Sequence, residues 1–262
     1  MIRLDQVSIS LSGREVVSGL SFEARPGALT AIIGPNGSGK TTTLRALSGE
    51  RDYRGRIEFS GRDLGSMTAA EMALARGVLQ QSVSLGFPFR VREILEMGII
   101  AGDVHSRAEA EKVMMAALGA VDLAGFEKRV ATALSGGEQA RMHMARVLCQ
   151  ISSPMREGRA RWLFLDEPVA SLDVKHQLAI MTLARNFARS GGGVIAVMHD
   201  LNLTAMFSDH VVMMRDGRLH AAGAPGDVFT EAHLAAVYGC ALAVQRDAAT
   251  GLIRVHPPHL AA

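Results

Sequence analysis

The segment Gly34-Pro35-Asn36-Gly37-Ser38-Gly39-Lys40-Thr41 decides how the rest of this chain is interpreted. It fits the pattern G-x-x-x-x-G-K-[ST], in which a glycine-rich loop cradles phosphate groups with its backbone N–H groups. The apolar run 29–33 before the loop predicts a buried strand, and residues 40–47 after it predict a helix. A strand, a glycine loop and a helix in this order favour a phosphate-binding site over a flexible Gly/Ser surface loop.

Each part of this loop has its own expected task. Glycines at positions 34, 37 and 39 allow positive φ and bring backbone N–H groups close to phosphate oxygens. The N-terminus of the following helix adds partial positive charge to the same place. Lys40 is expected to reach the β- and γ-phosphates and the Thr41 hydroxyl to ligate Mg²⁺, with Thr42 completing the nucleotide-binding segment.

Length and composition limit the class of protein. The chain has 262 residues, enough for one large α/β domain or two small ones, and 48% of them are hydrophobic. Apolar runs such as 194–198 are far shorter than the roughly 20 residues that span a bilayer, and no signal peptide is recognised. A net charge of +2 gives no indication of a nucleic-acid partner. Cys149 and Cys240 match no metal or disulfide pattern, so both are expected to be reduced and buried in a cytoplasmic protein.

The order of predicted segments indicates a mixed α/β fold. In chain order we predict antiparallel strands over 2–24, then strand, loop, helix and a strand pair over 29–65, a helical region from about 66 to 155, alternating strands and helices from 162, and a hairpin over 210–222 with Asp216-Gly217 as its turn. Residues 152–159 are interpreted as an exposed loop that interrupts this order.

A second group of polar residues follows the apolar run 162–165, which ends in Asp166 and Glu167. In an open α/β sheet, ligands bind at the carboxyl ends of the strands, so these acids are expected beside the phosphate loop. Asp166 would hold Mg²⁺, and Glu167 would orient and polarise an attacking water. The alternative is an acidic N-cap of the next helix, which Pro168 allows; the phosphate loop upstream makes it the weaker interpretation.

Five short motifs in a fixed order give the chain a family resemblance. The residues that carry it are 34–41, Leu134-Ser135-Gly136-Gly137-Glu138, 163–167, Ser171-Leu172-Asp173 and His199. These are similar to the Walker A, signature, Walker B, D-loop and switch-histidine motifs of the ABC-transporter ATPases, and the resemblance covers roughly residues 2–238.

The resemblance implies a particular architecture. We expect an α/β fold with the core of the P-loop NTPases: a mixed, largely parallel sheet with flanking helices and an N-terminal antiparallel β part. An α-helical subdomain would be inserted at about 82–155 in an ATPase domain spanning 2–238, and residues 239–262 would form a C-terminal extension.

The resemblance also implies which residues act. Glu167, His199, Lys40 and Gln81 would be catalytic, with ATP and Mg²⁺ as cofactors and Gln81 as a further Mg²⁺ ligand. Gln80 is the competing candidate for the Q-loop glutamine.

A second set of residues would act across a dimer. Ser135, Gly136, Gly137 and Asp173 would serve the nucleotide bound by a second copy of the chain, so that one copy is half of a catalytic unit. Near the N-terminus, Leu11 stands where the family usually has an aromatic residue that stacks on adenine, so GTP stays an alternative to ATP.

Within the family, the chain is similar to the ATPases of haem (hemin) importers, a group related to those for iron-siderophores and cobalamin. The segments behind this are 87–89, 134–141, 145–148, 161–168 and His176-Gln177. The resemblance implies separate permease subunits, a periplasmic binding protein and a peripheral position on the cytoplasmic face of the inner membrane. The alternatives are a siderophore or cobalamin importer, a soluble ABC ATPase acting on DNA or ribosomes, and a nucleotide-dependent binding module.

Overall fold

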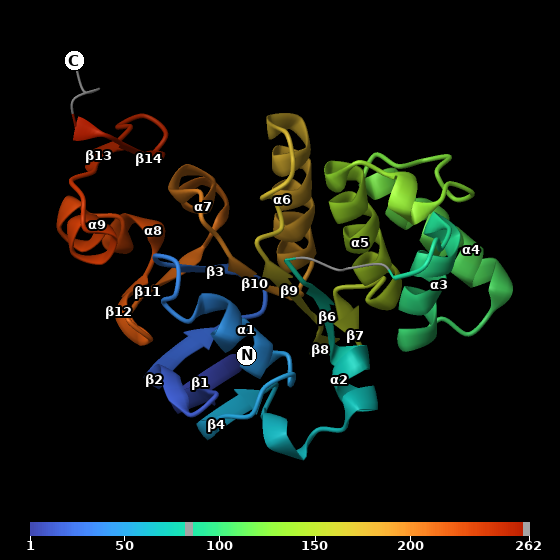
Figure 1. Ribbon diagram of the computed structural model, residues 1–262, viewed down its shortest axis with the longest axis horizontal. Helices are drawn as coiled ribbons and strands as arrows, with labels where there is room; N and C mark the ends of the chain where they lie inside the picture. Colours follow the sequence, from blue (N-terminus) through green and yellow to red (C-terminus); the bar gives the residue numbers. More distant parts are fainter. Residues whose placement is uncertain (82–85, 259–262) are drawn as a thin grey trace.

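Two β-sheets of six and four strands organise the protein, whose computed structural model describes residues 1–81 and 86–258 (Figure 1). The larger sheet contains, in spatial order, β12 (Arg218–Gly223), β11 (His210–Arg215), β3 (Leu29–Ile33), β10 (Gly193–Val197), β9 (Trp162–Asp166) and β6 (Arg76–Leu79). The antiparallel sheet contains β2 (Arg14–Ala24), β1 (Ile2–Leu11), β4 (Arg54–Phe59) and β5 (Arg62–Asp63).

The remaining elements are two short hairpins and the helices. The hairpins pair β7 (Met155–Arg156) with β8 (Arg159–Ala160) and β13 (Ala243–Arg246) with β14 (Ile253–His256). The helices are α1 (Lys40–Leu47), α2 (Ala69–Ala75), α3 (Val91–Ala101), α4 (Arg107–Ala120), α5 (Gly136–Gln150), α6 (Val174–Arg189), α7 (Leu201–Phe207), α8 (Pro225–Val228) and α9 (Glu231–Tyr238), with 3₁₀ turns at Leu64–Ser66 and Ala131–Ala133. In the described ranges every helix is too short or too polar to cross a membrane.

The central strands of the larger sheet explain where a site can form. Strands β3, β9 and β10 are parallel, and every one of their residues is buried, as expected for a sheet covered on both faces. Their carboxyl ends therefore meet at one edge of the sheet. The glycine loop follows β3, Asp166 ends β9, and His199 follows β10.

Two apolar layers hold this sheet in place. One lies between the two sheets and contains α1 together with Phe59, Trp162 and Phe164; the rings of Phe59 and Trp162 meet edge to face at 6.3 Å. The other covers the opposite face of the sheet and contains α6, α7 and the helical block α3 to α5, which lies to one side of the molecule (Figure 1). The expected mixed, largely parallel sheet with an antiparallel N-terminal part is confirmed.

The expectation that the region from about 66 to 155 is helical throughout is wrong at β6. Its four residues pair in parallel with β9, as the edge strand of the large sheet. A Cβ on Gly77 would lie 2.7 Å from Val147 Cγ1, so the glycine lets α5 pack directly on this strand. Four residues are too few to show a period of two. The predicted start of the helical subdomain at residue 82 lies outside the described residues.

Residues 152–159 are largely exposed, as expected, but part of this segment forms the β7–β8 hairpin instead of a loop. Its turn residues, Glu157 and Gly158, both have positive φ, at 49° and 73°. The hairpin predicted around Asp216-Gly217 is confirmed, with φ of 49° and 75° at the two turn residues.

The expectation that both cysteines are buried is correct for Cys149 only. Cys149 lies in the core on α5, and burial raises the pKa of its thiol to about 12. Cys240 is exposed, because it follows Gly239, which ends α9 in the left-handed conformation and turns the chain outward.

Candidate functional site

The glycine loop has the positive φ angles that its sequence predicts, at Gly34, Gly37 and Gly39. Gly39 has a φ of 94° at the N-cap of α1, and a Cβ there would lie 2.8 Å from Val17 Cγ2. The Lys40 ammonium donates hydrogen bonds to the carbonyl oxygens of Gly34 and Pro35, at 2.9 and 3.0 Å. Burial lowers the pKa of Lys40, while the carboxylates of Glu167 and Asp166 act in the opposite direction. A cation therefore stands against the loop, where an incoming phosphate would meet it.

Thr41 and Asp166, both predicted as Mg²⁺ ligands, lie together. The Thr41 hydroxyl donates a hydrogen bond of 2.9 Å to Asp166 Oδ1. Burial raises the pKa of Asp166, and the bond from Thr41 counteracts that effect. A hydroxyl oxygen and a carboxylate oxygen at one place are donors that suit a hard cation such as Mg²⁺.

The Glu167 carboxylate is held from two sides. Gln81 Nε2 donates to Glu167 Oε2 at 2.8 Å, and His199 Nε2 lies 2.6 Å from Glu167 Oε1. The Glu167 backbone has a φ of 52°, unusual for a residue other than glycine. Gln80, by contrast, directs its amide to Glu50 at 3.3 Å, so only Gln81 of the two candidates reaches Glu167.

These groups surround one cleft of about 330 Å³. Its lining residues are Val16, Asn36, Gly37, Gly39, Lys40, Thr41, Thr42, Gln81, Glu167 and His199. Leu11 is not among them, whereas Val16 is. Ser38 belongs to the glycine loop, and its buried hydroxyl has no hydrogen-bond partner in the described part of the chain.

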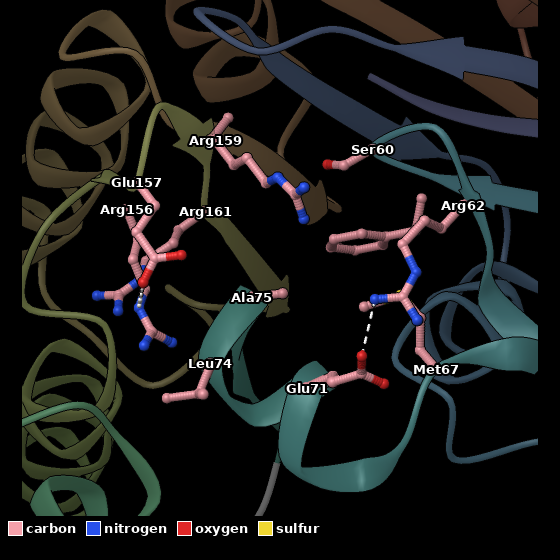
Figure 2. A pocket seen from close by; sticks show the side chains of 12 residues that line it. Ser60, Arg62, Met67, Glu71, Leu74, Ala75, Arg156, Glu157, Arg159 and Arg161 are labelled. Carbon is pink, nitrogen blue, oxygen red and sulfur yellow. Dashed lines mark hydrogen bonds and ion pairs between the residues drawn. The ribbon is translucent and has the colours of Figure 1, made fainter.

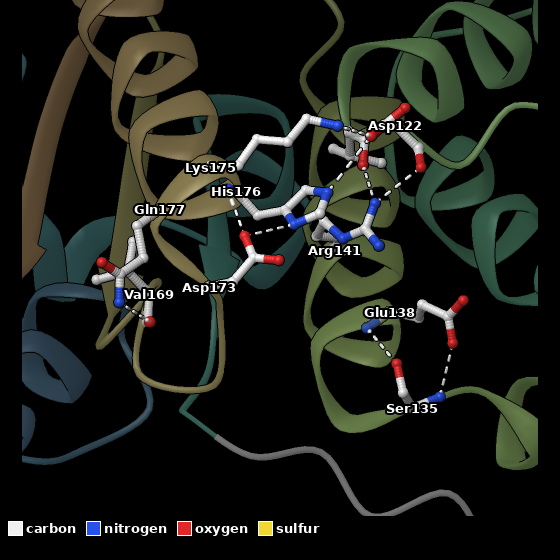
Figure 3. A network of polar contacts seen from close by, with 10 residues as sticks. Asp122, Ser135, Glu138, Arg141, Val169, Asp173, Lys175, His176 and Gln177 are labelled. Atoms are coloured by element: carbon white, nitrogen blue, oxygen red, sulfur yellow. Dashed lines mark hydrogen bonds and ion pairs between the residues drawn. The ribbon is translucent and has the colours of Figure 1, made fainter.

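The segment 135–137 lies at the N-terminus of α5 and lines none of this cleft. Ser135 and Glu138 form a capping box, in which Ser135 Oγ accepts from the Glu138 N–H at 3.3 Å and Glu138 Oε2 accepts from the Ser135 N–H at 2.8 Å (Figure 3). The bonds from Ser135 lower the pKa of Glu138. Because Ser135 and Gly136 are exposed, this helix end is open to another molecule.

Asp173 belongs to a polar network that sequence analysis missed (Figure 3). Asp173 caps α6, accepting from the His176 N–H at 2.9 Å and contacting His176 Nδ1 at 2.8 Å. Asp122, beyond α4, accepts from Lys175 Nζ at 2.8 Å. The network therefore ties the N-terminus of α6 to the helical block. The three-residue spacing of Asp173 and His176 was an available N-cap signal, but nothing in the sequence indicated Asp122.

A smaller cavity of about 190 Å³ lies behind Glu167 and Gln81, and sequence analysis did not anticipate it either. His143 of α5 lines it and is only 5% exposed. Neither ring nitrogen has a hydrogen-bond partner in the described part of the chain. Burial, followed by the charge of Arg146, lowers the pKa of His143 to about 4.

We expect this histidine to make stability depend on pH. The unfolded chain binds a proton near the ordinary pKa of 6.5 and the folded chain only near 4, so stability is full above 6.5 and is lost as the pH falls toward 4. The loss approaches about 1.4 kcal/mol per pH unit inside this window. Urea unfolding of the wild type and of His143→Met at pH 7 and pH 5 measures it. Parallel pH profiles for the two proteins would contradict the assignment.

Comparison with known proteins adds to this geometry. Residues 17–170 match the ABC transporter family. The chain is 55% identical to a hemin import ATP-binding protein, HmuV, of Rhizobium meliloti (strain 1021), covering 93% of each chain. It is 53% identical to the HmuV protein of Rhizobium johnstonii, covering 96% of this chain and 95% of the relative. A bacterial ABC transporter cassette solved as a dimer has the same fold, with a TM-score of 0.75 at 24% identity over 86% of this chain and 99% of that one.

Proposed function

From the premise that this chain belongs to the ABC transporter family, we propose that it hydrolyses ATP to drive hemin uptake through separate permease subunits. The observation that carries the proposal is the 55% identity, over 93% of both chains, to a protein described as a hemin import ATP-binding protein. The alternatives are ATPases for iron-siderophores or cobalamin and, less well supported, a soluble ABC ATPase.

In this proposal the cleft residues divide the work of hydrolysis. Lys40 and the backbone N–H groups of the glycine loop bind the phosphates. Glu167 takes the proton from the attacking water as general base, while Gln81 and His199 hold the two oxygens of its carboxylate in place. Mg²⁺, held by Thr41, Asp166 and Gln81, would neutralise charge on the phosphates. His199 would also stabilise the γ-phosphate during transfer.

We propose that two copies close on two ATP molecules. Ser135, Gly136, Gly137 and Asp173 would then contact the nucleotide of the partner copy. Their place outside the cleft of their own copy supports this, because the exposed N-terminus of α5 can bind an anion that another molecule brings to it. The dimeric structure of a cassette with the same fold supports this pairing.

We propose that the helical block, at about 82–155 within an ATPase domain of 2–238, contacts the permease. Exposed apolar side chains support this: Phe87 is 70% exposed, and Ile100 on α3 is 84% exposed. Such a contact would place the chain on the cytoplasmic face of the inner membrane as a peripheral subunit, with a periplasmic binding protein delivering hemin. Residues 239–262 would form a C-terminal extension.

Growth on hemin tests the transported ligand. A strain lacking its own hemin-import ATPase, supplied with this chain and its permease, is expected to grow with hemin as the sole iron source. The same strain carrying Glu167→Gln is expected not to grow. Growth on a ferric siderophore but not on hemin would contradict the hemin assignment while leaving the ATPase assignment in place.

A further inference from the structure

A third cavity, of about 240 Å³, lies between β4 and β5, α2 and the β7–β8 hairpin (Figure 2). Arg161, which lines it, directly precedes β9, whereas Asp166 ends that strand at the nucleotide cleft. In the described part of the chain the two cavities share no lining residue. This cavity is therefore a separate site at the opposite end of β9.

The cavity is rich in arginine. Its lining contains four, Arg62, Arg156, Arg159 and Arg161. Arg62 donates one hydrogen bond to Glu71 at 2.8 Å, so its guanidinium has further N–H groups for another acceptor. The side chain of Arg159 has no ion pair or hydrogen bond within the part of the chain that the structure describes. Arg62 and Arg159 approach the same space from different elements (Figure 2).

The other two arginines are tied to the same acid. Arg161 Nη2 lies 2.5 Å from Asp103 Oδ2, and Arg156 Nε lies 3.4 Å from the same oxygen. Glu157 adds a contact to Arg156 at 3.5 Å. The Arg161 side chain is only 2% exposed, yet its Nε has no hydrogen-bond partner in the described residues. Surrounding protein atoms cover that nitrogen, so Arg161 is part of the wall of the cavity, and Arg159 supplies donors that face it.

Apolar side chains complete the lining and limit what fits. Phe59, Met67, Leu74 and Ala75 contribute to it, from β4, the segment before α2 and α2 itself. At about 240 Å³ the cavity is smaller than most sites for drug-sized molecules, which measure about 300–1,000 Å³. It has room for a small amphipathic molecule.

We propose that this cavity binds a small organic anion. Its carboxylate or phosphate head lies between Arg159 and Arg62, which approach the same space, and its apolar body lies against Ala75 and Leu74 (Figure 2). A guanidinium binds either head group through parallel N–H bonds, which explains why arginine rather than lysine occupies these positions. The acids of the cavity do not oppose the anion, because Glu71 and Glu157 each pair with an arginine.

Titration calorimetry on the full chain tests binding with three probes. Phenyl phosphate and phenylacetate carry the two candidate head groups on an aromatic body, and 2-phenylethanol lacks the charge. Saturable binding of at least one anion, with none of the alcohol, is expected. Absence of saturable binding for both anions at millimolar concentration overturns the proposal.

Variants locate the site. Arg159→Ala is expected to weaken anion binding about tenfold or more, the loss of one charge-assisted hydrogen bond. Leu74→Glu, which places a charged side chain where the apolar body lies, is expected to weaken it as well. Arg218→Ala, an exposed arginine on β12, is the matched control and leaves binding unchanged. Lys40→Ala also leaves it unchanged; if this variant alone abolishes binding, the probe occupies the nucleotide cleft and the proposal is wrong.

Discussion

Glu167→Gln is expected to leave ATP binding intact and to lower the rate of hydrolysis by about 10²–10⁴-fold. The amide keeps the size of the side chain and still accepts a bond from Gln81, but it cannot take a proton from water. With ATP bound and not turned over, two copies are expected to stay closed as a dimer. Phosphate release measures hydrolysis, a nucleotide-binding assay measures the affinity for ATP, and size-exclusion chromatography with ATP detects the dimer.

The matched control is Glu109→Gln, which makes the same chemical change in the exposed first turn of α4. It is expected to hydrolyse ATP at the wild-type rate. Normal hydrolysis by Glu167→Gln would remove Glu167 from the role of general base, and failure of that variant to bind ATP would show that its effect is structural.

Ser135→Arg is expected to abolish hydrolysis by the dimer while each copy still binds ATP. Ser135 lies outside the cleft of its own copy, so a bulky cation there blocks only the approach of the partner's nucleotide. ATP affinity at high dilution and hydrolysis at high protein concentration separate the two steps.

Ser135 also caps α5, so Ser135→Arg costs about 1 kcal/mol of stability for a reason unrelated to catalysis. Ser106→Arg is the control for that loss, because Ser106 caps α4 in the same way, accepting from the Glu109 N–H at 3.2 Å. It is expected to lose the cap and keep hydrolysis. If Ser135→Arg failed to bind ATP as a monomer, the assignment of this segment to the partner's site would be wrong.

The sequence predicts those parts of the fold whose cause is local. The apolar runs that become β3, β9 and β10 are buried on both faces and therefore apolar throughout. The Asp216-Gly217 turn can be predicted because its geometry requires positive φ, which favours Asp-Gly at the two turn positions. Strand β6 could not be predicted, because its partner, β9, lies more than 80 residues away in the chain. Hairpin β13–β14 could not be predicted either, because hydrogen bonds between Asn202 of α7 and the backbone of Val255 hold it in place.

The same distinction applies to the site. Strand ends predict where Asp166 and Glu167 lie, because the carboxyl ends of parallel strands meet at one edge. The sequence predicts Gln81 rather than Gln80 as the Q-loop glutamine, and the coordinates add that Gln81, of the two, directs its amide to Glu167. Asp122 and His143 could not be recognised, because their roles come from residues that packing brings to them and no short motif surrounds either.

Because Glu167 has a positive φ, the residue that would be most stable at this position differs from the residue that the proposed hydrolysis requires. A side chain with a Cβ in the left-handed region costs roughly 1 kcal/mol, and glycine would avoid that cost but would bring no carboxylate. Stability therefore favours glycine or asparagine at position 167, and in the proposed mechanism only the need for a general base retains glutamate. We therefore expect relatives that no longer hydrolyse ATP to carry glycine or asparagine at this position.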